Sequence, residues 1–406
     1  MLHPELTRVR EYLERQQGAM TRFLAELVTA ESPSTVPESQ GHVIDLLSWS
    51  LEEVGYRVRL LRGDRTGGHL FGRPERHGRG RPLQLLMGHC DTVWPIGTLH
   101  RMPVTVEGDV LRGPGSFDMK GGLTQMVYAV RAIYELGLEP EVTPVILVNS
   151  DEEIGSADSE RWVRMLARRA DRAMILEPAL GHNGLIKTAR KGVGQFQVKV
   201  TGKSAHTGLD PGKGASAIEE LSHVVLALHG LSDLERGITV NVGQIEGGFR
   251  PNVVAPESSA VVDVRVPTME MGREVEEAIR AIVPITPGTT IEVGGSVDRP
   301  PLERSPRNRR LWHAAQAIGR SLGEPVNEGT AGGGSDGNTT SQYTATLDGL
   351  GSVGDGAHAE HEFVRVDLMP QRAALLAGLI LMPPLDRVQW PPEQDAVPQL
   401  ARGDGA

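Results

Sequence analysis

The sequence predicts an α/β protein in which helices flank a mainly parallel sheet and a smaller α+β domain is inserted. Three observations support this prediction. Up to about residue 190, short apolar runs alternate with helical patterns, which is typical of buried parallel strands joined by helices. Beyond that point, apolar and polar residues alternate as in half-buried strands. Near Asn308 a helical pattern returns, so we expect the middle part to be an insertion.

The elements of the larger domain follow from these patterns. Apolar residues at helical spacing predict helices at 24–28, 43–51, 123–133, 162–170, 308–322 and 370–381. Apolar runs predict buried strands at 83–87, 145–148 and 173–176. A polar stretch rich in Gly and Arg, 62–81, predicts a hairpin or loop.

The inserted part has its own order of elements: strand, helix, strand, strand, helix, strand. They are expected at 196–200, 217–231, 238–245, 259–266, 269–283 and 290–297. This order is that of the split βαβ, or ferredoxin-like, arrangement. We therefore expect the larger domain to comprise 1–190 and 305–385, the insertion 191–304, and a polar tail 386–406.

Composition excludes several classes of protein. The chain has 406 residues, 39% of them hydrophobic, and a formal net charge of −10, which is an ordinary globular mixture. An acidic balance with only 4% aromatic residues argues against nucleic-acid binding. Without an apolar run long enough to cross a bilayer or serve as a signal peptide, we expect no membrane association and a cytoplasmic location. The single cysteine, Cys90, excludes an intramolecular disulfide.

Acidic and histidine side chains directly follow the predicted strands. His89 and Asp91 follow the first strand, 151–153 (Asp-Glu-Glu) follows the second, and Glu177 follows the third. Sites in open α/β sheets form outside the carboxyl ends of the strands. We therefore expect these residues to converge on one rim of the sheet.

Two further residues join this set: Asp118, just before a helix, and His358, in a Gly-rich turn. Histidines and carboxylates without thiolates suit zinc, or else cobalt or manganese. One zinc needs fewer carboxylates, and a carboxylate bridging two metals explains the surplus. Of Glu152 and Glu153, one can then bind metal while the other acts as general base. The alternative is a set of unrelated solvated turns and surface histidines, which the joint pattern disfavours.

Six motifs are similar to those of one known family. These motifs are 88–93 (GHCDTV), 115–122 (GSFDMKGG), 150–155 (SDEEIG), 177–178 (EP), 202–206 (GKSAH) and 332–336 (GGGSD). They resemble the co-catalytic di-zinc exopeptidases and deacylases. That family includes acetylornithine deacetylase, succinyl-diaminopimelate desuccinylase, aminoacylase and the carboxypeptidase G type of glutamate carboxypeptidase, to which the likeness is strongest. The resemblance extends from about residue 24 to about residue 381.

The resemblance implies two zinc ions per subunit in a zinc exopeptidase-like catalytic domain. His89, Asp118 and Glu177 would hold one ion, and Asp118, Glu153 and His358 the other, with Asp118 bridging. Cobalt or manganese could replace zinc.

Other roles follow from the same resemblance. Asp91 would orient His89 by binding the ring nitrogen of His89 that does not face the metal. Glu152 would be the general base that later protonates the leaving amine. His361, the rival of His358, lacks the family setting and is expected at the surface.

The inserted domain of this family is a lid and dimerisation module, which implies a homodimer. His206 would polarise the scissile carbonyl. In dimeric members, it would do so for the substrate in the active site of the partner subunit. Asn252 would contact substrate from this domain. Arg265 and Arg299 stand where carboxylate-binding members carry arginines, whose planar fork suits a carboxylate. Otherwise, each is an exposed charge at a strand end.

The loop around Gly333 lacks the ending of a phosphate-binding P-loop, and its N–H groups would instead face the substrate carboxylate. Glutamate-specific relatives carry a lysine where this chain has Leu185, with Lys187 two residues later. A C-terminal glutamate therefore stays one expected substrate residue without strict preference, and an apolar or mixed C-terminal residue is the alternative.

The expected activity is hydrolysis of the amide bond to an amino acid with a free α-carboxylate, in small peptides or N-acyl amino acids. Two alternatives remain: an N-acetyl or N-succinyl amino acid deacylase of biosynthesis, and a catalytically inactive ligand-binding member. A nucleotide-binding α/β protein is disfavoured because phosphate motifs are missing.

Overall fold

The computed structural model describes residues 3–76 and 80–388. They form two compact units. Of the described residues, the large unit comprises 3–76, 80–188, 304–330 and 335–388, and the small unit comprises Ala189–Glu303 and Ala331–Gly334. Most of the expected polar tail, 389–406, lies outside the described residues.

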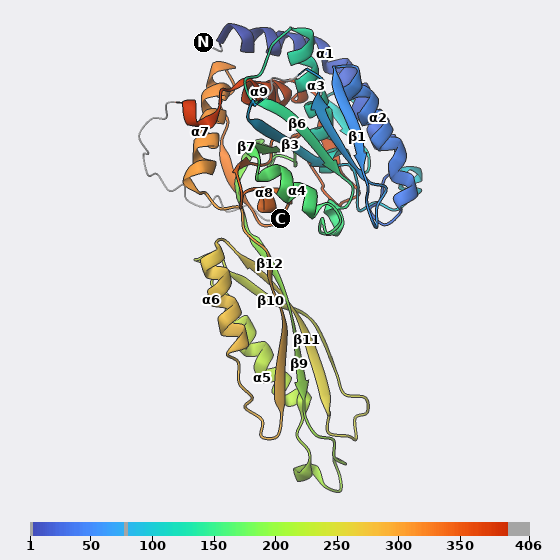
Figure 1. Cartoon of the computed structure of the whole chain (residues 1–406). Coiled ribbons are helices and arrows are strands. Elements are labelled where there is room, and N and C mark those ends of the chain that lie inside the picture. Colours follow the sequence, from blue (N-terminus) through green and yellow to red (C-terminus); the bar gives the residue numbers. More distant parts are fainter. Residues whose placement is uncertain (1–2, 77–79, 389–406) are drawn as a thin grey trace. The chain divides into compact units, whose positions relative to one another are not determined.

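A six-stranded mixed sheet forms the centre of the large unit, in the order β1-β2-β6-β3-β7-β14 (Figure 1). Its strands are β1 (Tyr56–Leu61), β2 (His69–Pro74), β3 (Leu83–His89), β6 (Thr143–Asn149), β7 (Ala170–Ile175) and β14 (Ala345–Leu347). β3 pairs in parallel with β6 and β7, and β14 pairs in parallel with β7. β1 and β2 form an antiparallel hairpin at one edge. The predicted α/β fold with parallel central strands is confirmed.

Helices cover both faces of this sheet. They are α1 (His3–Thr29), α2 (Gln40–Glu52), α3 (Gly121–Glu135), α4 (Glu160–Ala167), α7 (Pro306–Ser321), α8 (Asp336–Thr340) and α9 (Met369–Leu381). Leu86 of β3 belongs to the core shared with α1, α2, α3, α7 and α9, whereas its neighbours Leu85 and Met87 pack in a second core with α4. Because side chains of a strand alternate between faces, a strand covered on both sides is mostly apolar. Among the described residues, no helix combines the length and apolar character needed to span a membrane.

A small antiparallel sheet beside the main one was not expected from the sequence. It consists of β4 (Thr105–Glu107), β5 (Val110–Arg112), β15 (Gly354–Asp355) and β16 (Phe363–Arg365), in the order β15-β16-β5-β4. Phe363 lies opposite Arg112. The pairing brings the turn before β16 next to the segment that follows β5. β8 (Ile186–Arg190) and β13 (Glu328–Ala331) form a separate two-stranded sheet.

The small unit has a four-stranded antiparallel sheet in the order β10-β11-β9-β12, with two helices on one face (Figure 1). Its elements are β9 (Gly192–Thr201), α5 (Ala217–His229), β10 (Thr239–Gly247), β11 (Glu257–Val266), α6 (Met269–Arg280) and β12 (Thr290–Arg299). The order of strands and helices is that of the expected ferredoxin-like arrangement. Alternate residues of β9, such as Phe196 and Val198, are buried beneath the helices, as the sequence alternation indicated.

The glycine-rich segment Ala331–Gly334 belongs to the small unit, although its place in the sequence put it in the larger domain. The reason is local hydrogen bonding. Arg190 Nη1 donates to the carbonyls of Gly333 and Gly334 at 3.1 and 3.0 Å, and the backbone N–H of Lys191 donates to the Ala331 carbonyl.

One buried arginine joins β7 to the end of α9. Arg172 is fully buried and donates to the side chain of Gln84 and to the carbonyls of Leu379, Met382 and Pro383. The last carbonyls of a helix have no partner within the helix. The guanidinium supplies donors to these carbonyls where water has no access.

We expect Arg172→Met to lower the free energy of unfolding by about 3 kcal/mol, because it leaves several buried carbonyls without donors. Urea denaturation followed by circular dichroism measures the change. Arg169→Met, at an exposed position just before the same strand, is the matched control and should unfold at the wild-type urea concentration. An unchanged midpoint for Arg172→Met would contradict the role given to this arginine.

Candidate metal centre

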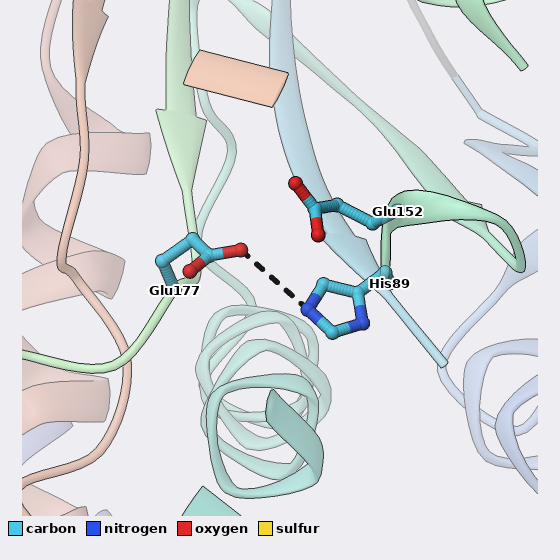
Figure 2. A group of neighbouring side chains, drawn as sticks. All are labelled: His89, Glu152 and Glu177. Carbon is cyan, nitrogen blue, oxygen red and sulfur yellow. Dashed lines mark ion pairs between the residues drawn. The ribbon is translucent and has the colours of Figure 1, made fainter. Parts of the chain in front are cut away.

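The predicted donor residues of the large unit meet at the carboxyl ends of three neighbouring parallel strands. His89 is the last residue of β3, Glu152 and Glu153 begin the turn η4 (Glu152–Ile154) after β6, and Glu177 follows β7. Figure 2 shows the side chains of His89, Glu152 and Glu177 directed toward one another. The order of the strands, β6-β3-β7, places these three strand ends side by side.

Asp118 lies between the two histidines. Its Oδ1 is 3.2 Å from His89 Nε2, and its Oδ2 is 3.6 Å from His358 Nε2. His89 Nε2 is also 3.5 Å from Glu177 Oε1, and His358 Nε2 is 3.0 Å from Glu153 Oε2. Each oxygen of Asp118 therefore faces a different histidine, as expected of a carboxylate that bridges two ions.

Two overlapping groups of donors have ligand atoms within 4.8 Å of one another: His89 with Glu152 and Glu177, and His89 with Asp118 and Glu153. Glu152 is thus part of the same constellation as the residues predicted to bind metal. Its expected role as general base stays a prediction.

The protonation behaviour of the cluster reflects crowded negative charge. Burial raises the pKa of Glu153, and Asp118 adds to this effect. Burial alone would lower the pKa of His89, but hydrogen bonds to Asp118 and other carboxylates hold it well above its usual value. The hydrogen bond to Glu153 raises the pKa of His358 to about 9. Both histidines are therefore in an environment that favours positive charge.

The donor set fits divalent metal ions. Imidazole nitrogens and carboxylate oxygens are the ligands that zinc takes when thiolates are missing. Glu153 Oε1 is buried and has no hydrogen-bond partner among the described residues. A buried carboxylate oxygen without a donor is costly, and a bound cation would satisfy it.

Asp91 does more than the sequence suggested. His89 Nδ1 lies 3.0 Å from the backbone carbonyl of Asp91 and 3.5 Å from its carboxylate. The carboxylate accepts a hydrogen bond from Ser34 Oγ at 2.6 Å and from the backbone N–H groups of Glu152 and Glu153, each at 3.2 Å. Asp91 therefore holds both the histidine and the turn that bears the two glutamates.

The small antiparallel sheet positions His358 next to Asp118. His358 lies in the turn between β15 and β16, with a positive φ of 61°. β16 pairs with β5, and β5 leads into the turn η3 (Ser116–Lys120) that carries Asp118. His361 is exposed, as the sequence indicated.

Glu362 was missed as a site residue by sequence reasoning. It is buried and accepts hydrogen bonds from Trp94 Nε1 and from the backbone N–H groups of Gly115, Phe117 and Asp118. Burial raises its pKa to about 7 although these four donors act in the opposite direction. The only sequence signal was an acid four residues after His358.

The remaining predicted residues belong to the small unit, so their relation to the metal centre stays a prediction. His206 is exposed, and its Nδ1 accepts a hydrogen bond from the Gly208 N–H at 3.1 Å. Thr207 donates to the backbone carbonyl of Asn252. His206 and Asn252 therefore lie on adjacent segments. Gly333 belongs to the loop whose carbonyls Arg190 binds.

Arg265 and Arg299 share one face of the small sheet, because both lie opposite Val193 across neighbouring strands. This is the face without helices. Arg265 forms a bidentate ion pair with Asp263, with both distances 2.9 Å. Lys191 was not singled out in the sequence. Burial and the nearby Arg265 lower the pKa of its ammonium group, so a third cation lies in this region.

Comparisons with known proteins agree with the geometry. Residues 85–382 match the model of peptidase family M20/M25/M40. Carboxypeptidase G2 of Pseudomonas sp. (strain RS-16) is 29% identical over 380 residues, covering 90% of this chain and 89% of that protein. Succinyl-diaminopimelate desuccinylase of Gluconacetobacter diazotrophicus is 26% identical over 360 residues, covering 82% and 90%.

Solved structures share the fold. Aminopeptidase PepT of Bacillus cereus has a TM-score of 0.76 at 20% identity, covering 90% of this chain and 98% of that one. The Bacillus subtilis YxeP protein, described as a dinuclear metal-binding peptidase, has a TM-score of 0.64 at 14% identity, covering 91% and 98%. With the family model matched over most of the chain and the donor residues gathered at one rim, the chain belongs to peptidase family M20/M25/M40 and is a metal-dependent hydrolase.

Proposed function

We propose that this hydrolase binds two zinc ions and releases an amino acid with a free α-carboxylate from small peptides or N-acyl amino acids. The observation that supports it best is Asp118, whose two oxygens face His89 and His358 separately. Two zinc ions held there would polarise the scissile carbonyl and lower the pKa of a water molecule. The name of the relative carboxypeptidase G2 points to the same bond, next to a C-terminal residue.

Glu152 is proposed to move the proton. Its carboxylate lies with His89 and Glu177 at the centre (Figure 2), and its backbone N–H is held by Asp91. An anchored carboxylate can accept a proton from water and pass it to the leaving nitrogen. His206 remains our candidate for stabilising negative charge on the carbonyl oxygen.

The small unit is proposed to recognise the substrate carboxylate. Arg299 packs closely against Gly334. A Cβ atom at position 334 would lie only 2.7 Å from Cδ of Arg299. Arg265 and Lys191 lie close by, and Arg265 is paired with Asp263. Guanidinium groups bind carboxylates in a bidentate manner, which fits an amino acid product.

The position equivalent to the glutamate-binding lysine does not supply a cation here. Leu185 packs beside Gly329 of β13, and Lys187 is only 8% exposed. We therefore do not propose that Leu185 or Lys187 selects for a C-terminal glutamate. The similarity to succinyl-diaminopimelate desuccinylase and to acetylornithine deacetylase favours N-acyl amino acid deacylation as the second candidate function.

Product analysis by mass spectrometry tests the proposal and separates these candidates. Zinc-loaded protein is incubated with N-acetyl and N-succinyl amino acids, dipeptides and aminobenzoyl-glutamate conjugates. We expect release of a free amino acid from at least one class, and the preferred class decides between peptidase and deacylase. Full zinc occupancy with no release from any member would favour an inactive ligand-binding protein.

Glu152→Gln is expected to lower kcat by about 10²–10⁴-fold, because the amide cannot accept the proton. The zinc content, measured by mass spectrometry of metals, should stay at the wild-type value. Glu160→Gln, at the partly exposed start of α4, should turn over normally. Wild-type activity of Glu152→Gln would show that another group is the base.

Arg299→Met is expected to raise KM by about 10–100-fold, since a charge-assisted hydrogen bond contributes about 1.5–3 kcal/mol. Steady-state kinetics on the best substrate measures the change, with kcat followed separately. The control is Arg273→Met, on the exposed face of α6 in the same unit. Equal KM values for the two variants would remove Arg299 from substrate recognition.

We also propose a homodimer formed through the small unit. β10 is one of the two edge strands of its sheet, and Leu226, Ile245 and Phe249 are 73%, 65% and 66% exposed. An unpaired strand edge beside exposed apolar side chains is a surface that favours association. The family resemblance implies the same assembly.

Light scattering should therefore give a dimer mass for the wild type and a lower mass for Leu226→Glu at the same concentration. The substitution lies at an exposed position of α5, so the circular dichroism spectrum should not change. Thr29→Glu, at the exposed end of α1 in the large unit, is the control. A monomeric wild type would contradict the proposed dimer.

A further inference from the structure

Glu362 is a buried acid surrounded by hydrogen-bond donors. Its side chain is 1% exposed. Oε2 accepts from Trp94 Nε1 at 2.9 Å and from the Gly115 N–H at 2.8 Å. Oε1 accepts from the N–H groups of Phe117 and Asp118 at 2.8 and 3.0 Å. Each oxygen therefore has two donors.

These donors come from segments that carry the candidate metal ligands. Trp94 follows β3, which ends at His89, and the three N–H groups belong to η3 and the residues just before it, where Asp118 lies. Glu362 itself ends the turn that carries His358. One carboxylate thus connects three segments that are distant in sequence.

The four contacts suit a group that only accepts hydrogen bonds. All four neighbours donate an N–H, and only acceptor oxygens can match them. A glutamine would direct its NH₂ group at two of these donors and leave them unsatisfied. Hydrogen bonds to a charged acceptor are also stronger than those between neutral groups.

We propose that Glu362 is a positioning residue of the metal centre, which holds the backbone of Asp118 so that its two oxygens face His89 and His358. This inference rests on the proposed function only in assuming that the centre binds two metal ions. Glu362 does not belong to either group of neighbouring donors found at the centre, so it acts through Asp118 and the His358 turn. A residue that merely stabilised the fold would affect unfolding but not metal affinity.

The test is metal binding by the full-length protein without substrate. Apo protein is titrated with Zn²⁺ in competition with a chromogenic chelator, which gives both dissociation constants. For Glu362→Gln we expect at least one constant to rise by about 10–100-fold, the usual effect of losing a residue that orients a ligand. The absorption spectrum of the Co²⁺ form should also change, because the coordination geometry changes with Asp118.

Two further variants make the result decisive. Glu360→Gln, two residues away and exposed, should bind Zn²⁺ like the wild type. If Glu362→Gln fails to fold, Glu362→Asp keeps the charge but shortens the reach to the four donors, and it should weaken Zn²⁺ binding in the same direction. Circular dichroism and thermal unfolding establish that each variant is folded.

The outcomes separate this inference from the proposed activity. A folded Glu362 variant with wild-type Zn²⁺ constants and an unchanged Co²⁺ spectrum would overturn the positioning role, whatever the enzyme hydrolyses. A wild type that binds two Zn²⁺ ions but cleaves no amide would overturn the proposed function and leave the inference standing. A wild type that binds no Zn²⁺ would overturn both.

Discussion

The arrangement of the large unit depends on one constraint, which is the close packing of several carboxylates in a place largely closed to water. Asp118, Glu153 and Glu177 each lie within ion-pair distance of His89 or His358. Burying like charges costs free energy unless positive charge accompanies them. The raised pKa values of both histidines and of Glu153 express this need. Divalent cations satisfy it, which gives the metal dependence of the family a physical basis in this chain.

The donors can keep their places because buried acids behind them hold the backbone. Asp91 accepts the N–H groups of Glu152 and Glu153, and Glu362 accepts that of Asp118. Turns that follow buried strands would otherwise contain N–H groups without acceptors, which is costly away from water. The same carboxylates therefore satisfy the turns and fix the direction of the residues that face the centre. Most donors of the centre lie in turns, and these hydrogen bonds hold the turns in place.

Much of the candidate centre was predictable because each donor has a local signal. His89, Glu153 and Glu177 each follow an apolar run, and parallel strands end at a common rim. Glu362 and Lys191 had no such signal. Glu362 receives donors from residues far earlier in the chain, and Lys191 gains its neighbour Arg265 only through pairing of distant strands. Hydrogen-bond partners of this kind cannot be inferred from periodicity.

The sequence by itself determined the class of fold, the order of elements in the small unit and the residue types at the strand ends. Periodic burial of apolar side chains encodes these features locally. Only the tertiary structure decided that β16 pairs with β5, which brings His358 to Asp118, and that Ala331–Gly334 clusters with the small unit. These outcomes depend on which edges and side chains meet once the core has formed, and contacts between distant segments leave no periodic pattern in the chain.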